Sequence, residues 1–318
     1  MASSPSPDPR PAVVLHGGRC AGWPDRLPDV ETLEYEVRAV AGLDYDDGEP
    51  RAPSRLAARV RAALAAVGGT VESTVVHVHN HALGKNGSLP GALAELAGEG
   101  WPLLLQIHDF AEDFRPLNYQ RLRAGASGQV DGDWAAAAYP QAGHVHYAVL
   151  NQRDARILAA AGVEPARVHA LPNPAGELGP LPPREPARRQ LARRFGVPED
   201  RPLLLYPIRG IRRKNLGEAL LWSALAGGAW HLGVTLPPLN PAERPSYDRW
   251  KALAAALGLP AAFEIGGEAG LAFQENLAAA DRMLTTSVAE GFGLVFLESW
   301  LAGKSLVGRD LPEITADF

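Results

Sequence analysis

The sequence predicts an α/β protein made of two consecutive doubly wound domains, each built on a parallel sheet. Short apolar segments alternate with helical segments along the chain, which is the order that produces parallel sheets. A stretch dense in proline and glycine, residues 174–185, separates two such series. With 318 residues the chain is long enough for two domains of ordinary size, each with its own core.

The first domain is expected over residues 11–176, after a Ser/Pro-rich leader (1–10) that we expect to be disordered. Apolar and β-branched residues predict strands at 11–16, 74–79, 102–108, 147–151 and 168–173. Helical periodicity predicts helices at 54–67, 90–98 and 152–161.

A linker at 177–185 leads to the second domain, expected over residues 186–318. A basic helix is predicted at 186–195, and the apolar segment 202–206 opens the new strand–helix series. Further along, residues 278–287 end as a short buried strand would, and residues 294–301 have the spacing of a helix packed on a sheet. A strand, a glycine turn and a helix start therefore meet near residue 290.

Composition limits the function classes. Charged residues make up 21% of the chain and the formal net charge is -5, so no general basic field for nucleic acid is predicted. The single Cys20 excludes an intramolecular disulfide and fits a reducing compartment. The N-terminus lacks the pattern of a signal peptide, and no apolar run approaches the roughly 18 residues of a membrane span. We therefore expect a soluble cytoplasmic protein without a transmembrane segment.

The most informative segment runs from Ser287 to Glu298, where two carboxylates eight positions apart enclose a glycine turn. A helix N-terminus offers free backbone N–H groups and the positive end of its dipole, and Gly291 and Gly293 would let an anion such as a diphosphate approach the main chain. Glu290 is expected at the mouth of the turn, and Glu298 about two helical turns further on. A lone Gly-x-Gly would indicate only a surface turn before an ordinary amphipathic helix.

The full pattern, Glu-Gly-Phe-Gly-Leu-x-x-x-Glu, resembles the Glu-x7-Glu signature of retaining glycosyltransferases of the GT4 family, which adopt the GT-B fold. The resemblance implies two Rossmann-like domains facing a cleft, and transfer of a sugar from a nucleotide-diphosphate-sugar donor with retention of configuration. It implies that Glu290 contacts the donor sugar as a catalytic residue. It further implies donor binding by Gly291, Phe292, Gly293, Leu294 and Glu298.

A basic loop, Arg209-Gly-Ile-Arg-Arg-Lys214-Asn215, follows the first strand of the second domain. Cations at this point would neutralise the negative charge that develops on a diphosphate leaving group. A solvated basic loop is the plainer explanation of an isolated cluster. The Arg-x4-Lys-Asn pattern, however, also resembles GT4 enzymes, in which the Arg and Lys contact the donor phosphates. By this resemblance Arg209 and Lys214 are both donor-binding and catalytic.

His108-Asp109 ends an apolar strand of the first domain, at the sheet edge where catalytic residues of α/β domains collect. A hydrogen-bonded structural histidine is the plainer alternative. The context Gln106-Ile-His108-Asp109 resembles the GT4 strand end whose His faces the reacting sugar, which makes His108 a predicted catalytic residue. The resemblance as a whole runs from about Val13 to the last residue.

His77, His79 and His81 alternate, so all three are expected on one face of a strand, with a spacing that could bind a metal. We favour a metal-free interpretation, because GT-B enzymes generally need no divalent ion for the donor diphosphate. No cofactor is predicted, since the nucleotide sugar is a substrate. The Asp-x-Asp tripeptides at 44–46 and 131–133 match metal–nucleotide sites of GT-A transferases, but such tripeptides are common by chance.

Two features depart from the family pattern. Gly17 and Gly18, predicted to contact the donor, form a shorter turn than the glycine-rich loop of many GT4 members. The chain also ends soon after Leu311, where GT-B proteins usually continue with more strand and helix, so the second domain is expected to be incomplete.

The resulting hypothesis is a retaining, metal-independent hexosyltransferase. The family favours UDP- or GDP-hexose as donor and leaves the acceptor and the oligomeric state open. A GT-B phosphorylase or a sugar-nucleotide epimerase would use the same scaffold. A non-catalytic nucleotide-sugar-binding or scaffold protein is the third alternative.

Overall fold

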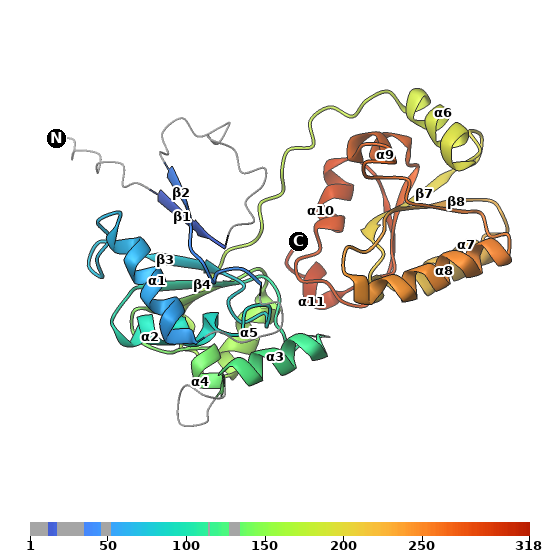
Figure 1. Ribbon diagram of the computed structural model, residues 1–318. Coiled ribbons are helices and arrows are strands. Elements are labelled where there is room, and N and C mark those ends of the chain that lie inside the picture. Colours follow the sequence, from blue (N-terminus) through green and yellow to red (C-terminus); the bar gives the residue numbers. More distant parts are fainter. Residues whose placement is uncertain (1–11, 18–34, 46–51, 114, 127–133) are drawn as a thin grey trace. The chain divides into compact units, whose positions relative to one another are not determined.

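The computed structural model describes residues 12–17, 35–45, 52–113, 115–126 and 134–318. The chain divides into two compact units (Figure 1). Unit 1 comprises Met1–Leu150 and Asp154–Leu171, and unit 2 comprises Asn151–Arg153 and Pro172–Phe318. The predicted leader and Cys20 lie outside the described residues.

Unit 1 contains a four-stranded parallel sheet in the order β3-β4-β5-β6. Its strands are β3 (Val76–His79), β4 (Leu103–Ile107), β5 (Val145–Val149) and β6 (Val168–Ala170). A separate parallel pair is formed by β1 (Ala12–His16) and β2 (Tyr35–Ala39). The helices are α1 (Pro53–Ala65), α2 (Leu89–Gly98), α3 (Pro116–Ala126), α4 (Trp134–Ala138) and α5 (Gln152–Ala160).

The core of unit 1 forms around β4. Successive side chains of a strand point to opposite faces, so Leu103, Leu105 and Ile107 share one face, where all three are buried. They belong to one cluster with the apolar stripe of α1, which includes Leu56 and Val60. The β1–β2 pair joins the same cluster through partly buried residues such as Leu15, although among the described residues it forms a sheet separate from the four-stranded one.

Unit 2 is built on a five-stranded parallel sheet in the order β11-β10-β7-β8-β9. The strands are β7 (Leu203–Arg209), β8 (His231–Leu236), β9 (Ala261–Phe263), β10 (Arg282–Thr285) and β11 (Leu306–Gly308). The helices are α6 (Arg184–Phe195), α7 (Leu216–Leu225), α8 (Arg244–Ala256), α9 (Phe273–Ala279), α10 (Leu294–Leu301) and α11 (Pro312–Thr315).

The central strand β7 shows that this sheet is covered on both faces. Leu203 and Leu205 belong to a cluster with residues of α6 and α9. Leu204 and Tyr206, on the other face, belong to a cluster with residues of α7 and α8. Helices on both sides of a parallel sheet make a doubly wound unit, so the predicted α/β fold is confirmed.

The strand order places a topological switch point between β7 and β10. The chain leaves β7 toward β8 on one side, whereas it leaves β10 toward β11 on the other. Ligands of open α/β sheets bind outside the carboxyl ends of the strands at such a point. The loops that follow β7 and β10 are therefore the first place to look for a site in unit 2.

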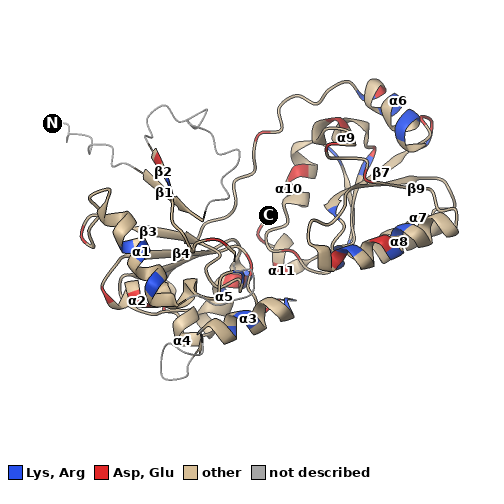
Figure 2. Cartoon of the chain, in the orientation of Figure 1, with Lys and Arg blue, Asp and Glu red and all other residues tan. Residues whose placement is uncertain are grey.

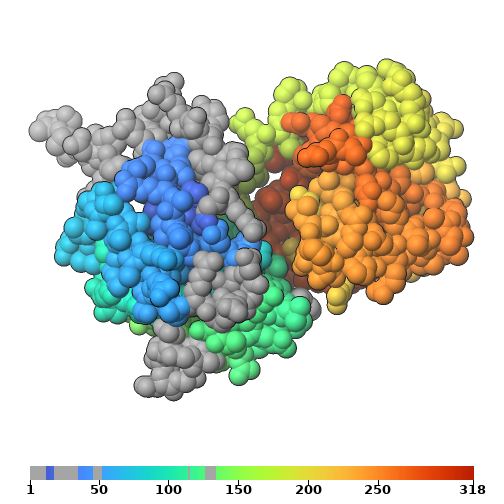
Figure 3. All heavy atoms as spheres, viewed as in Figure 1, coloured from blue at the N-terminus to red at the C-terminus, as the bar shows by residue number. Residues whose placement is uncertain are grey.

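Two helices of unit 2, α6 and α8, are rich in charged residues. The helix α6 bears five arginines in its 12 residues, and α8 carries both signs (Figure 2). Side chains of the segment around α8, drawn in orange, form much of the visible face of unit 2 (Figure 3). Within the described part of the chain, every helix is too short or too polar to cross a membrane.

Candidate functional site

Hydrogen bonds tie the loops after β7 and β10 together. The Tyr206 hydroxyl donates to the carbonyl oxygen of Lys214 at 2.6 Å and accepts from the backbone N–H of Thr286 at 3.2 Å. The Thr286 hydroxyl donates to the same Lys214 carbonyl at 3.0 Å. The backbone N–H of Val288 donates to the carbonyl of Arg213 at 2.9 Å. These bonds hold the basic loop beside the start of the glycine motif.

Glu290 is the centre of an ion-pair cluster between these loops. Arg213 Nη1 donates to Glu290 Oε2 at 3.0 Å and to the carbonyl oxygen of Ala289 at 2.9 Å. Lys214 Nζ donates to the other carboxylate oxygen, Oε1. The side chains of Glu290 and Lys214 are only 6% and 12% exposed. Each buried charge therefore depends on its partner, because an unpaired ion at this depth is costly.

Burial and pairing have opposite effects on these groups. Burial alone would raise the pKa of Glu290, but attraction to Lys214 and Arg213 lowers it below its ordinary value. The pKa of Lys214 is lowered, chiefly by burial, although Glu290 opposes this. Burial raises the pKa of Glu298, and Lys214 partly offsets the effect. Lys214 is thus the positive charge that acts to lower the pKa of both carboxylates of the motif.

The glycine turn takes its shape from Gly293, which lies directly before α10. Its φ of 85° is in the left-handed region, and a Cβ there would lie 2.8 Å from the Phe296 ring and 2.9 Å from Ile314. The helix α10 then begins at Leu294. Its Glu298 is half-buried, and no described residue donates a hydrogen bond to its carboxylate. That carboxylate can accept hydrogen bonds from a ligand.

The basic loop contributes Arg213 as well as the predicted Lys214. Arg209 ends β7 with an exposed side chain, and among the described residues no carboxylate lies within ion-pair distance of it. Sequence reasoning relied on the Arg-x4-Lys spacing and overlooked Arg213. The sequence marks Arg213 only as one of three consecutive basic residues. The 3-10 turn over Arg212–Lys214 directs their side chains differently.

In unit 1, His108 follows β4 directly and pairs with another histidine. Its Nε2 lies 2.9 Å from Nδ1 of His79, and the two rings are stacked with centroids 5.2 Å apart. The side-chain oxygen of Asn80 accepts from the backbone N–H groups of His108 at 2.8 Å and of Asp109 at 3.2 Å. These two hydrogen bonds to Asn80 hold the turn at the end of β4.

The expectation that three alternating histidines share one face is wrong for His81. The strand β3 ends at His79, and Asn80 has a φ of 53°, which turns the chain. His81 is 1% exposed and bonds the carbonyl of Ala138 at 2.8 Å, and burial lowers its pKa to about 4. Among the described residues, no three His, Cys, Asp or Glu side chains are arranged to hold a metal ion.

The predicted glycine turn of unit 1 is described only in part. Gly17 packs against the main chain of Asp44, since a Cβ at Gly17 would lie 2.2 Å from the Asp44 nitrogen. Gly18, Asp46 and residues 131–133 lie outside the described residues.

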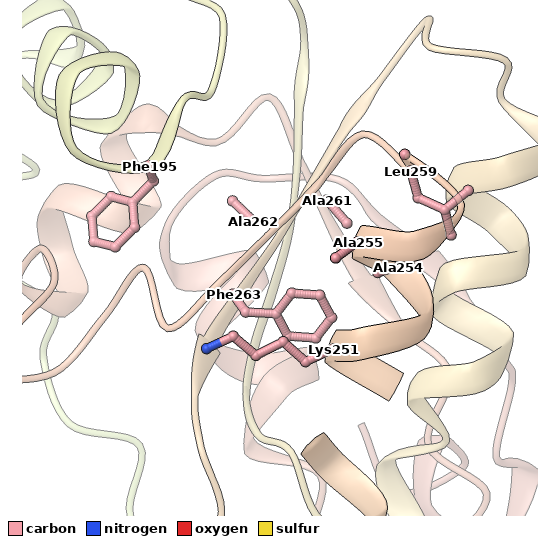
Figure 4. A pocket seen from close by; sticks show the side chains of 9 residues that line it. Phe195, Lys251, Ala254, Ala255, Leu259, Ala261, Ala262 and Phe263 are labelled. Carbon is pink, nitrogen blue, oxygen red and sulfur yellow. The ribbon is translucent and has the colours of Figure 1, made fainter. Parts of the chain in front are cut away.

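A cavity of about 290 Å³ lies at the β9 edge of the unit 2 sheet (Figure 4). It is lined by Phe195 at the end of α6, by residues of α8 and its following turn, and by Phe263 of β9. Its one charged group, Lys251, pairs with Glu264 at 3.1 Å. None of the predicted site residues lines this cavity.

Comparison with known proteins adds a sequence relative. The chain is 30% identical over 254 residues to the mannosylglucosyl-3-phosphoglycerate synthase of Petrotoga mobilis. The alignment covers 78% of this chain and 48% of that protein, so the chain spans about half the length of this curated relative. No family model matches the chain.

Solved structures share the fold at low sequence identity. The Anabaena HepE protein, in complex with UDP and glucose, has a TM-score of 0.57 at 19% identity, over 87% of this chain and 67% of its own. A glycosyltransferase from Rickettsia africae has a TM-score of 0.61 at 12% identity, over 88% of this chain and 68% of its own. Sucrose-phosphate synthase from Thermosynechococcus elongatus has a TM-score of 0.57 at 16% identity, over 86% of this chain and 71% of its own. The two α/β units thus match structural neighbours of GT-B type.

Proposed function

We propose that the chain is a glycosyltransferase that moves a hexose from a nucleotide-diphosphate-sugar donor to an acceptor, with retention of configuration as in the GT4 family. The observation that carries this proposal is the cluster at the switch point of unit 2, where two cations of the basic loop, Arg213 and Lys214, meet the carboxylate of Glu290 in the glycine motif. The Petrotoga relative is named a synthase of a glycosylated phosphoglycerate, and HepE binds UDP and glucose, which supports this class of activity.

The proposed chemistry is electrostatic. When the bond between the sugar and the diphosphate breaks, negative charge develops on the leaving phosphate. Lys214 and Arg209 would neutralise it, and the free backbone N–H groups at Gly291–Leu294 would add the positive end of the α10 dipole. Because side-chain cations supply this charge, we propose that the reaction needs no divalent metal and no cofactor.

The remaining predicted residues would orient the donor. The carboxylate of Glu298, which has no donor among the described residues, would accept from the ribose hydroxyls. Glu290 would contact the sugar and stabilise positive charge at its anomeric carbon. From unit 1, His108 would contact the sugar, and Gly17 and Gly18 would contact the donor. We propose UDP- or GDP-hexose as donor, and the cytoplasm as the place of reaction.

The test is the release of nucleoside diphosphate from a panel of sugar nucleotides, measured with and without acceptors. The acceptors should include glycosylated phosphoglycerates, given the name of the relative. We expect turnover with at least one UDP- or GDP-hexose, unchanged by EDTA, and a product whose anomeric proton shows the donor configuration by NMR. Glu290→Ala should abolish turnover while nucleotide still binds. No release of nucleoside diphosphate from any donor would contradict the transferase proposal.

A further inference from the structure

We propose that Arg213 joins Lys214 and Arg209 in the phosphate site of unit 2, and that Glu290 occupies this site in the ligand-free protein until the phosphates of a ligand displace its carboxylate. The ligand class, a nucleoside diphosphate, rests on the proposed function. The role of Arg213 and the exchange of one anion for another rest on the contacts in unit 2.

The first observation is the unused hydrogen-bonding capacity of Arg213. Its Nη1 serves both Glu290 and the carbonyl of Ala289. Its Nε is buried without a partner, and no described residue accepts a hydrogen bond from Nη2. A buried guanidinium with unpaired donors is unfavourable, and phosphate oxygens are acceptors that match its planar fork. The side chain is 28% exposed, so a ligand can reach it.

The second observation is the balance of charge. Two cations share the single carboxylate of Glu290, through Arg213 on one oxygen and Lys214 on the other. Arg213 also disfavours the charged form of Lys214, as expected for two positive charges in close proximity. The three ion-paired groups therefore carry two positive charges and one negative charge, while Glu298 acts on Lys214 from beyond ion-pair distance. A diphosphate would offer the two cations more acceptor oxygens than the one carboxylate of Glu290 does.

The third observation is that the cations are fixed by their backbone. The carbonyl of Arg213 accepts from Val288, and that of Lys214 accepts from the hydroxyls of Tyr206 and Thr286. Ligand binding thus needs only a change of side-chain partner, with the main chain already in place. A site prepared in this way loses little conformational entropy when it binds.

The experiment is isothermal titration calorimetry with UDP, GDP, ADP and inorganic pyrophosphate at one salt concentration. We expect Arg213→Gln to weaken the binding of the preferred nucleoside diphosphate by about tenfold or more, the loss typical of a charge-assisted hydrogen bond. Arg212→Gln is the matched control, because Arg212 is the neighbouring residue, carries the same charge and is exposed. It should change the affinity less than twofold. Glu290→Gln should tighten binding severalfold, because it removes the competing charge.

If Arg213→Gln and Arg212→Gln weaken nucleotide binding equally, the effect comes from the general positive field of the loop and the inference is overturned. Weaker nucleotide binding by a folded Glu290→Gln variant would also overturn it. If Arg213→Gln does not fold, Arg213→Lys keeps the charge without the fork, and it should still bind several times more weakly than the wild type. Affinity equal to wild type in that variant would overturn the inference. A wild-type protein that binds nucleoside diphosphate but releases none from any sugar nucleotide would refute the transferase proposal alone. A wild type that binds neither nucleoside diphosphate nor pyrophosphate would refute both.

Discussion

Tyr206 offers a way to loosen the connection between the two loops without touching a charged side chain. Its ring is fully buried in unit 2, and its hydroxyl bonds Lys214 and Thr286 and lies 3.1 Å from Ser287 Oγ. Tyr206→Phe keeps the ring and removes only the oxygen. The shape of the core should stay the same, so any change reports the lost hydrogen bonds.

The expected cost follows from those bonds. The Lys214 carbonyl keeps the Thr286 hydroxyl as a donor at 3.0 Å, so its loss is small. The backbone N–H of Thr286 loses its acceptor in a buried place, which costs about 1–3 kcal/mol. We therefore expect about 2 kcal/mol of local destabilisation, which corresponds to roughly a 30-fold larger population of the opened loop.

Hydrogen exchange with mass spectrometry measures this directly. In Tyr206→Phe, peptides covering residues 282–293 should exchange about 30-fold faster at the Thr286 amide. Tyr147→Phe is the control, because Tyr147 is equally buried but donates to the carbonyl of Pro140 in unit 1. It should leave the 282–293 peptides unchanged. Identical exchange of these peptides in wild type and Tyr206→Phe would refute the view that this hydroxyl holds the loops.

Three further predictions concern pH and backbone geometry. The pKa of Glu290 is depressed in the folded state, so its contribution to stability is present above the ordinary value of 4.5 and is lost as the pH falls through the folded value. Glu290→Gln should therefore flatten the acid unfolding curve of unit 2 below pH 4.5. Folding lowers the pKa of His81 from 6.5 to about 4, so unit 1 should lose about 3 kcal/mol of unfolding free energy as the pH falls from 6.5 to about 4. Urea titrations of His81→Gln should lack this pH dependence. Gly293→Ala should destabilise unit 2 by about 1–3 kcal/mol in calorimetry, because its Cβ would overlap Phe296 and Ile314, whereas an unchanged melting temperature would contradict the strain.

Much of the secondary structure could be predicted from the sequence, because those patterns have a local cause. Residues 294–301 were expected to be helical, and α10 covers them. The helix expected at 152–161 appears as α5, Gln152–Ala160. Strand β4 lies within the apolar run 102–108. In each case the local sequence pattern is sufficient to predict the element, and the alternation of strands and helices predicts the parallel sheet.

The features that the sequence did not predict depend on contacts distant in the chain or on single dihedral angles. The pairing of β1 with β2 outside the main sheet depends on which strands meet, and no local pattern records that. Arg213 is one of three consecutive basic residues, and only the turn decides which of them reaches Glu290. His81 leaves its predicted face because of one positive φ at Asn80.

The ion-pair cluster also has a consequence for how the protein is made. Lys214 and Glu290 are separated by 76 positions along the chain, and only the pairing of β7 with β10 brings them together. A contact between such distant residues cannot form before the loop between them closes, so we expect it to form after the local helices and turns. A ribosome must have released the chain beyond the glycine turn before the cluster can form. If the cluster binds a nucleoside diphosphate as we propose, capture of a labelled nucleotide by a growing chain would report when the native topology of unit 2 is complete.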